Sequence, residues 1–107
     1  MSSVTPGPGE FQAHVYGTVF GERPSVVARL RAGDELILVP DPPGTDDPSV
    51  WVHAPGGDVV GHLAPDVNRW MVPWMLDGHR CGARVVSVGG RETESWRRLV
   101  IVVTCRA

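Results

Sequence analysis

Polar and apolar residues alternate along the stretch that follows the first ten residues. The two sets are Phe11, Ala13, Val15, Gly17 and Val19 at odd positions, and Gln12, His14, Tyr16, Thr18 and Phe20 at even positions. A period of two is typical of a half-buried β-strand, because successive side chains point to opposite faces of a sheet. We therefore predict a first strand from Phe11 to Phe20 with one apolar face.

Five further short runs are rich in Val, Ile and Leu and are bounded by Gly, Pro and Asp, which predicts five more strands. They span Glu35–Val39, Ser49–His53, Val59–Leu63, Arg80–Val88 and Arg97–Cys105. The segment APGGD at residues 54–58 is typical of a hairpin connection, since glycine accepts positive φ. The last run contains LVIVVTC, which is apolar on both faces, as expected of a central or barrel-closing strand.

Two segments show helical spacing instead. Pro24 precedes a short amphipathic run from Val26 to Arg31, which Gly33 should end. A second helix is predicted from about Asp66 to Leu76, because apolar residues recur there at the spacing of one helix face. These residues are Val67, Trp70, Met71 and Trp74.

Six short strands with two inserted helices predict a mainly β fold, a small six-stranded barrel of the SH3-like or OB-like kind with two short α-helices. The chain of 107 residues is long enough for one such domain. Residues 1–10, MSSVTPGPGE, have hardly any large apolar side chain, so we predict a disordered tail there and a domain at residues 11–107. No apolar run approaches the roughly 20 residues of a membrane span, so we expect a cytoplasmic protein without membrane contact.

The distribution and type of charged residues limit the activities that we expect. The formal net charge is −2, but residues 1–66 hold nine acids and three arginines, whereas residues 67–107 hold seven arginines and three acids. Arginine supplies all ten cationic residues. Without lysine the chain has neither a Walker-type phosphate loop nor a Schiff-base nucleophile. We therefore expect no enzyme activity and no cofactor.

Nucleic-acid binding is the first functional hypothesis from the residues themselves. Barrels of this size bind single strands by pairing an arginine-lined groove with exposed rings on which bases stack. Val50 and Val52 should face the core, which turns Trp51 outward. His14 and Tyr16 share the less apolar face of the first strand. The arginines that could contact phosphates are Arg23, Arg80, Arg84, Arg97 and Arg98.

Several segments together resemble the HIRAN domain, from about Val15 to Val103. They are, in order, GTVFGER at residues 17–23, Gly33-Asp34 before a strand, Asp41-Pro42, Asp47-Pro48 ahead of Val50-x-Val52, and Gly61-His62-Leu63-x-Pro65. The first is similar to the Gly-x-x-Phe-x-x-Arg signature of that family. The resemblance implies the same small barrel and a nucleic-acid-binding module for single-stranded DNA, notably its 3′ end, in DNA repair or processing. The expected partners are single-stranded DNA or another nucleic acid, and a helicase or nuclease.

Individual residues follow the family pattern in part. Asp47 stands where the family has its acidic loop residue, His62 where it has the His or aromatic residue before Leu, and His14 near its aromatic residue on the first strand. The family's Asn-Pro-aromatic-Asp loop is here Gly44-Thr45-Asp46-Asp47. The loss of the aromatic residue removes one base-stacking platform. The predicted nucleic-acid-binding residues are His14, Tyr16, Arg23, Asp47, Trp51, His62, Arg84 and Arg97.

Other interpretations stay open at this point. Tyr16 and Trp51 could pack under the short helix or the loops. Exposed side chains of the longer helix could instead form a protein-protein interaction module, namely Trp70, Met71, Trp74 and Met75. Asp46 and Asp47 with a histidine could support hydrolysis.

The cysteines add two further alternatives. A zinc site would need His79 and Cys81 together with Cys105 and either His53 or His62. A bridge between Cys81 and Cys105 on neighbouring strands is geometrically possible. Because the chain has no secretion signal, we expect two reduced, partly buried thiols and no bound metal.

Overall fold

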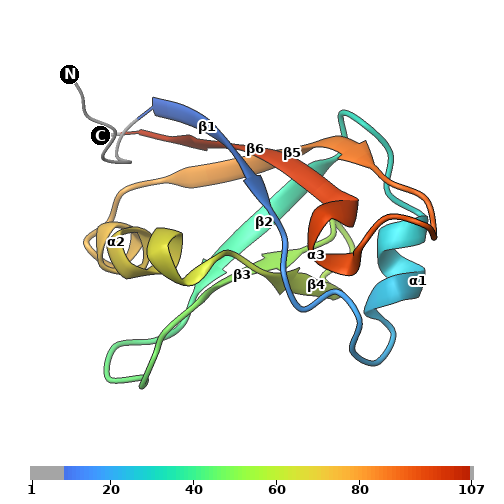
Figure 1. The fold of residues 1–107 in the computed structure, drawn as a ribbon. Coiled ribbons are helices and arrows are strands. Elements are labelled where there is room, and N and C mark those ends of the chain that lie inside the picture. The colour runs from blue at the N-terminus through green and yellow to red at the C-terminus, as the bar shows by residue number, and fades with distance from the viewer. Residues whose placement is uncertain (1–8, 107) are drawn as a thin grey trace.

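Strands and helices alternate along the chain much as the sequence predicts (Figure 1). The computed structural model describes residues 9–106. Its strands are β1 (Gly9–His14), β2 (Glu35–Pro40), β3 (Val50–His53), β4 (Val59–His62), β5 (Cys81–Val88) and β6 (Leu99–Cys105), and its helices are α1 (Arg23–Ala28), α2 (Pro65–Leu76) and α3 (Ser95–Arg98). Residues 1–8 of the predicted tail lie outside the described residues, and Gly9 and Glu10 belong to β1, not to a tail.

The six strands form one curled antiparallel sheet. Their order across the sheet is β1-β6-β5-β2-β3-β4. The two edges of the sheet meet just beyond β1, where the N–H of Tyr16 donates to the carbonyl of His62 at 2.8 Å and the N–H of His62 donates to the carbonyl of Tyr16 at 2.9 Å. We call this meeting point the seam. The sheet is thus a half-barrel, and the predicted mainly β, six-stranded fold is confirmed.

The core lies inside the curled sheet and takes alternate residues from the strands. In β6 the alternation is uninterrupted, with Leu99, Ile101 and Val103 fully buried and the residues between them partly exposed. Val50 and Val52 of β3 are also fully buried, as predicted. Removing these side chains from water is the main favourable contribution to folding.

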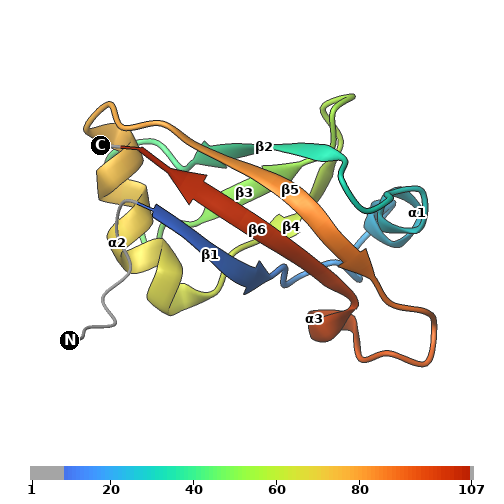
Figure 2. The same cartoon turned by 90° about the horizontal axis from the view of Figure 1, so that it is seen from above.

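The helices cover the two ends of the half-barrel, α2 at one end and α1 and α3 at the other (Figure 1, Figure 2). Helix α2 begins at Pro65, whose missing N–H costs nothing in a first turn. It turns Met71 and Val72 into the core. No helix within residues 9–106 is long and apolar enough to cross a membrane.

Asn68 is the buried polar residue that fastens α2 to the sheet, and its side chain is only 5% exposed. Its Oδ1 accepts a hydrogen bond from the N–H of Val50 at 2.9 Å, and its Nδ2 donates to the carbonyl of Leu63 at 2.9 Å. Two buried backbone groups at the ends of β3 and β4 therefore find their partners on the helix.

The first strand is shorter than predicted. Regular pairing ends at His14, and Gly17 has a φ of +71°, which reverses the alternation after the seam. Thr18 is consequently buried at 3% exposure and Val19 is 54% exposed, the opposite of the predicted faces. Glycine adopts positive φ at little energetic cost. The alternation of apolar and polar residues can therefore continue in the sequence beyond Gly17, although the strand itself ends before it.

The last strand and the shorter helix also begin at different residues from those expected. Arg97 and Arg98 belong to α3, a third helix, whereas the sequence analysis placed them at the start of the last strand. Helix α1 begins at Arg23, with Pro24 in its first turn, and ends at Ala28, so it lies earlier than the predicted run.

The two cysteines form a disulfide bond, which corrects the expectation of reduced thiols. Cys81 of β5 lies directly opposite Cys105 of β6, with their Cα atoms 4.1 Å apart. The next pair along the strands is hydrogen-bonded, since the N–H of Arg106 donates to the carbonyl of Arg80 at 2.9 Å. The cysteines therefore occupy a non-hydrogen-bonded pair, the position at which antiparallel side chains approach most closely.

Candidate nucleic-acid interface

A row of rings crosses the outer face of the seam. Pairing places Trp51 of β3 beside His62 of β4, and His62 beside Tyr16. Because Val50, Val52 and the neighbours of Tyr16 and His62 on the same strands turn inward, these three side chains point out of the half-barrel. The predicted outward orientation of Trp51 is confirmed, and all three rings are partly exposed.

Helix α3 adds a further ring to this row. The ring of Trp96 is stacked on that of Tyr16 with centroids 6.4 Å apart and planes 7° from parallel, and it meets His14 edge to face at 5.8 Å. Tyr16 lies 6.4 Å from His62, which lies 5.5 Å from Trp51. We call these five residues the aromatic cluster: His14, Tyr16, Trp51, His62 and Trp96.

Two guanidinium groups lie against the aromatic cluster. Cζ of Arg23 is 5.6 Å from the centroid of the Trp51 ring, and Cζ of Arg97 is 5.6 Å from that of Trp96. These are cation–π distances. A hydrogen bond of 2.8 Å from Nη1 to the carbonyl of Gly17 holds Arg23 in place. Arg97 is 3.7 Å from Glu94, but both side chains are more than half exposed, so this ion pair is screened by water.

The orientation of Trp51 is set by Asp41, which the sequence analysis did not count among the site residues. The indole N–H of Trp51 donates to Oδ1 of Asp41 at 2.8 Å, and Oδ2 of Asp41 accepts from the N–H of Ser49 at 2.9 Å. With both carboxylate oxygens engaged, Asp41 anchors the ring.

His62 is held in one orientation by its neighbours. Nδ1 lies 2.9 Å from the carbonyl of Leu63, and because a carbonyl only accepts, Nδ1 carries the hydrogen. The other edge of the ring lies over Gly17, where a Cβ atom would come within 3.0 Å of Cδ2 and Nε2. Gly17 thus supplies both the turn after the seam and the space that the His62 ring occupies.

Asp47 lies in a cleft beside the aromatic cluster. The cleft has a volume of about 580 Å³ and is lined by Asp47, Pro48, Ser49, His62, Pro65, Asn68 and Arg69. Asp47 has a φ of +45° and is exposed. The structure therefore brings Asp47 and His62 to one cleft, with Arg69 on its wall.

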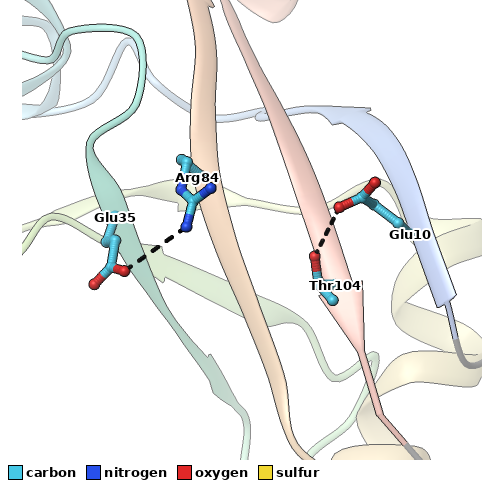
Figure 3. Close-up of polar contacts among 4 residues, drawn as sticks. All are labelled: Glu10, Glu35, Arg84 and Thr104. Carbon is cyan, nitrogen blue, oxygen red and sulfur yellow. Dashed lines mark hydrogen bonds and ion pairs between the residues drawn. The ribbon is translucent and has the colours of Figure 1, made fainter.

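Arg84 does not join the other predicted residues. It lies on the outer face of β5, facing Glu35 of β2 at 4.0 Å, with Thr104 and Glu10 on the strands to the other side (Figure 3). Between β5 and the seam lie β6 on one side and β2 and β3 on the other. The sequence analysis grouped Arg84 with the other site residues because it could not order the strands, and the strand order separates them.

Two of the other arginines considered for phosphate contacts have different surroundings. Nη2 of Arg98 donates to the carbonyls of Arg91 at 3.3 Å and Thr93 at 3.1 Å, which shapes the loop before α3. Arg80 directly precedes Cys81, the first residue of β5, and so lies in the segment that joins α2 to β5.

Trp96 is the functional candidate that the sequence analysis missed. It lies in a polar, turn-rich segment, GGRETESW. The sequence signal that could have identified it is a single large aromatic residue in that segment, followed directly by two arginines. At 43% exposure it is the most exposed member of the aromatic cluster. A large ring in a polar loop has no local partner, so its role depends on the tertiary contact with Tyr16.

The alternatives fare differently in the structure. Within residues 9–106 no three His, Cys, Asp or Glu side chains converge as metal ligands, and the proposed zinc thiols are bonded to each other. The α2 face proposed for protein contacts is largely core: Met71 is fully buried, and Trp70 and Met75 pack against the core. The ring of Trp74 stacks on His79 at 3.8 Å.

No family model matches the chain, and no curated protein and no solved structure is significantly similar to it. The resemblance to the HIRAN domain therefore stays a prediction, and the functional argument depends on the geometry of the aromatic cluster.

Proposed function

We propose that this protein binds single-stranded nucleic acid, with single-stranded DNA as the expected form, through the aromatic cluster. The observation that carries the proposal is the continuity of five rings over the outer face of the seam, with guanidinium groups against both ends of the row. A base stacked on an aromatic side chain contributes about 1–3 kcal/mol, and every base has a face that can stack. Such a surface suits an unpaired strand better than a duplex, whose bases are already stacked.

The charges near the cluster fit the same ligand. Arg23 and Arg97 keep N–H donors free for phosphate oxygens, while Asp41 has both oxygens engaged and adds no free acceptor there. The formal net charge of −2 gives no long-range attraction to an anionic strand. We therefore expect micromolar rather than tighter affinity, dominated by short-range stacking. A role in DNA repair or processing, beside a helicase or nuclease, rests on the resemblance alone and belongs to the proposal.

The test compares two arginines that differ in position. Arg97→Glu should weaken binding of a single-stranded oligonucleotide about tenfold or more and lower the salt slope by about one, since one phosphate contact is replaced by repulsion. Arg84→Glu changes the net charge equally, but β6 on one side and β2 and β3 on the other separate Arg84 from the seam. Because salt screens exposed charges over about 8–10 Å, this variant should change the affinity less than about twofold. Fluorescence anisotropy at two salt concentrations measures both.

A third variant separates stacking from charge. Trp96→Ala should weaken binding by about tenfold, the equivalent of one lost stack, with the salt slope unchanged. Equal losses for Arg97→Glu and Arg84→Glu would indicate non-specific attraction and contradict the proposal. Absence of binding by the wild-type protein at low salt would favour the alternative of a protein-interaction module.

A further inference from the structure

A second exposed aromatic ring lies beyond the end of the aromatic cluster. Phe20 is 62% exposed, the highest exposure among the large apolar side chains within residues 9–106. It projects from the turn between the seam and α1, where Gly21 has a φ of +53°. An isolated exposed phenylalanine is ordinary, but this one borders a pocket and a cation.

Arg23 connects Phe20 to the aromatic cluster. Its Cζ lies 5.6 Å from the centroid of the Phe20 ring and also 5.6 Å from that of Trp51. Its Nη1 is tied to the carbonyl of Gly17, so the guanidinium is fixed between the two rings. The row of flat groups therefore continues from Trp51 through Arg23 to Phe20.

A pocket of about 250 Å³ opens next to Phe20. Its lining consists of Phe20, Gly21, Glu22, Arg23, Val26, Asp58 and Val59. Val26 and Val59 supply apolar walls, while Glu22 and Asp58 supply acceptors at the rim. Two carboxylates disfavour a phosphate inside the pocket, but they accept hydrogen bonds from the amino and imino groups of a nucleobase. The phosphate of such a nucleotide would lie toward Arg23.

We propose that Phe20, Arg23 and this pocket form an additional nucleobase subsite, which lengthens the stretch of single strand that the protein holds. This inference rests on the proposed function, because the subsite continues the aromatic cluster and has no role without a strand bound there. Arg23 is the junction, with its guanidinium at cation–π distance from both rings and its remaining N–H groups available to the phosphate that joins the nucleotides on either side.

The test is the dependence of affinity on strand length. Oligothymidylates of about four to sixteen nucleotides cover the range of site sizes known for single OB-like folds. Wild-type affinity should rise with length until the subsite is filled. Phe20→Ala should match the wild type on the shortest strands that bind and fall about tenfold behind on the longest, the loss expected for one stacked base. Phe20→Trp should keep the full rise.

Two controls accompany the series. Leu76→Ala removes another exposed apolar side chain, at 43% exposure, from the end of α2 that lies away from the seam, and should follow the wild type at every length. Asp58→Asn removes one repelling charge from the pocket and should strengthen binding of long strands only.

The outcomes separate the two proposals. If the wild type binds and Phe20→Ala follows it at every length, or loses the same factor at every length, the additional subsite is refuted while the proposed function stands. If the wild type binds none of the strands, the proposed function fails and the subsite fails with it.

Discussion

At the scale of single residues, the seam depends on the absence of a side chain. Gly61 is buried in β4, and a Cβ there would collide with the carbonyl oxygen of Tyr16 and the side chain of Val15. Both are held by the sheet, so the clash cannot be relieved by a rotamer change. The same carbonyl accepts the hydrogen bond from His62 that closes the half-barrel.

We therefore expect Gly61→Ala to lower the free energy of unfolding by about 3 kcal/mol, the upper part of the range for overpacking. Gly56 is the matched control, because it lies in the hairpin between β3 and β4, has no positive φ and has open space where a Cβ would be. Urea unfolding followed by tryptophan fluorescence measures both variants. Equal stability of the two would show that the seam adapts to a methyl group.

Asp47 carries a prediction about strand ends. A carboxylate accepts a hydrogen bond from a free 3′-hydroxyl and repels a 3′-phosphate. Since Asp47 and His62 line one cleft, the wild type should prefer a strand ending in 3′-hydroxyl over the same strand ending in 3′-phosphate. Asp47→Asn should remove that preference, and asparagine tolerates the positive φ at this position. Competition binding measures it.

Asp46→Asn serves as the control, because Asp46 is the adjacent exposed acid and does not line the cleft. It should keep the preference of the wild type. If the wild type binds both strand ends equally, Asp47 is only a turn residue, and the end-recognition hypothesis is wrong.

The residue scale also shows what the sequence could predict. Alternation correctly turned Trp51 outward between Val50 and Val52, because those three residues are regular strand. It failed from Gly17 to Phe20, where a positive φ reverses the faces without changing the pattern. Trp96 escaped notice because its partner, Tyr16, is distant in sequence, and no local rule pairs them.

At the scale of elements, α2 is joined to the sheet by hydrogen bonds as well as by apolar packing. Asn68 satisfies the N–H of Val50 and the carbonyl of Leu63 in a buried position. Asn68→Ala should lower the free energy of unfolding by about 1–3 kcal/mol, because it leaves the buried N–H of Val50 without a partner and removes one of the two hydrogen bonds to the carbonyl of Leu63. Arg69→Ala, an exposed change on the next residue of the helix, should alter stability by less than about 0.5 kcal/mol. Thermal unfolding with both variants provides the comparison.

Element types were more predictable than element ends. All six strands and both longer helices were expected, because Gly, Pro and Asp separate the apolar runs. Helix α3 was not, since four residues are too few for helical periodicity to show. The pairing of Cys81 with Cys105 required the register of β5 against β6, which no short-range pattern specifies.

At the scale of the whole molecule, the half-barrel has two ends with different constituents. The disulfide and α2 lie at one end, while Trp96 of α3 and Arg23 of α1 lie at the other (Figure 2). The candidate interface therefore draws its rings and cations from elements that are adjacent only because the sheet curls. Sequence reasoning named these residues except Trp96, but only the strand order shows that Arg84 is excluded from the group.

This separation gives a final prediction about the disulfide. The bond closes a loop with a sequence separation of 24 residues. Restricting the unfolded chain in this way stabilises the folded state by about 3 kcal/mol. Reduction, or the double substitution Cys81→Ala and Cys105→Ala, should therefore lower the free energy of unfolding by about that amount, measured by urea unfolding with and without a reductant.

Binding should respond differently from stability. Because the Cys81–Cys105 pair lies at the far end of β5 and β6 from α3, reduction should leave the affinity for a single strand unchanged under conditions where the protein stays folded. The amide protons of Tyr16 and His62 at the seam should keep their protection from hydrogen exchange, while those near the start of β5 lose part of theirs. A fall in affinity that accompanies loss of protection at Tyr16 and His62 would instead show that the two ends of the half-barrel are coupled, and that the sheet transmits the constraint from the disulfide to the aromatic cluster.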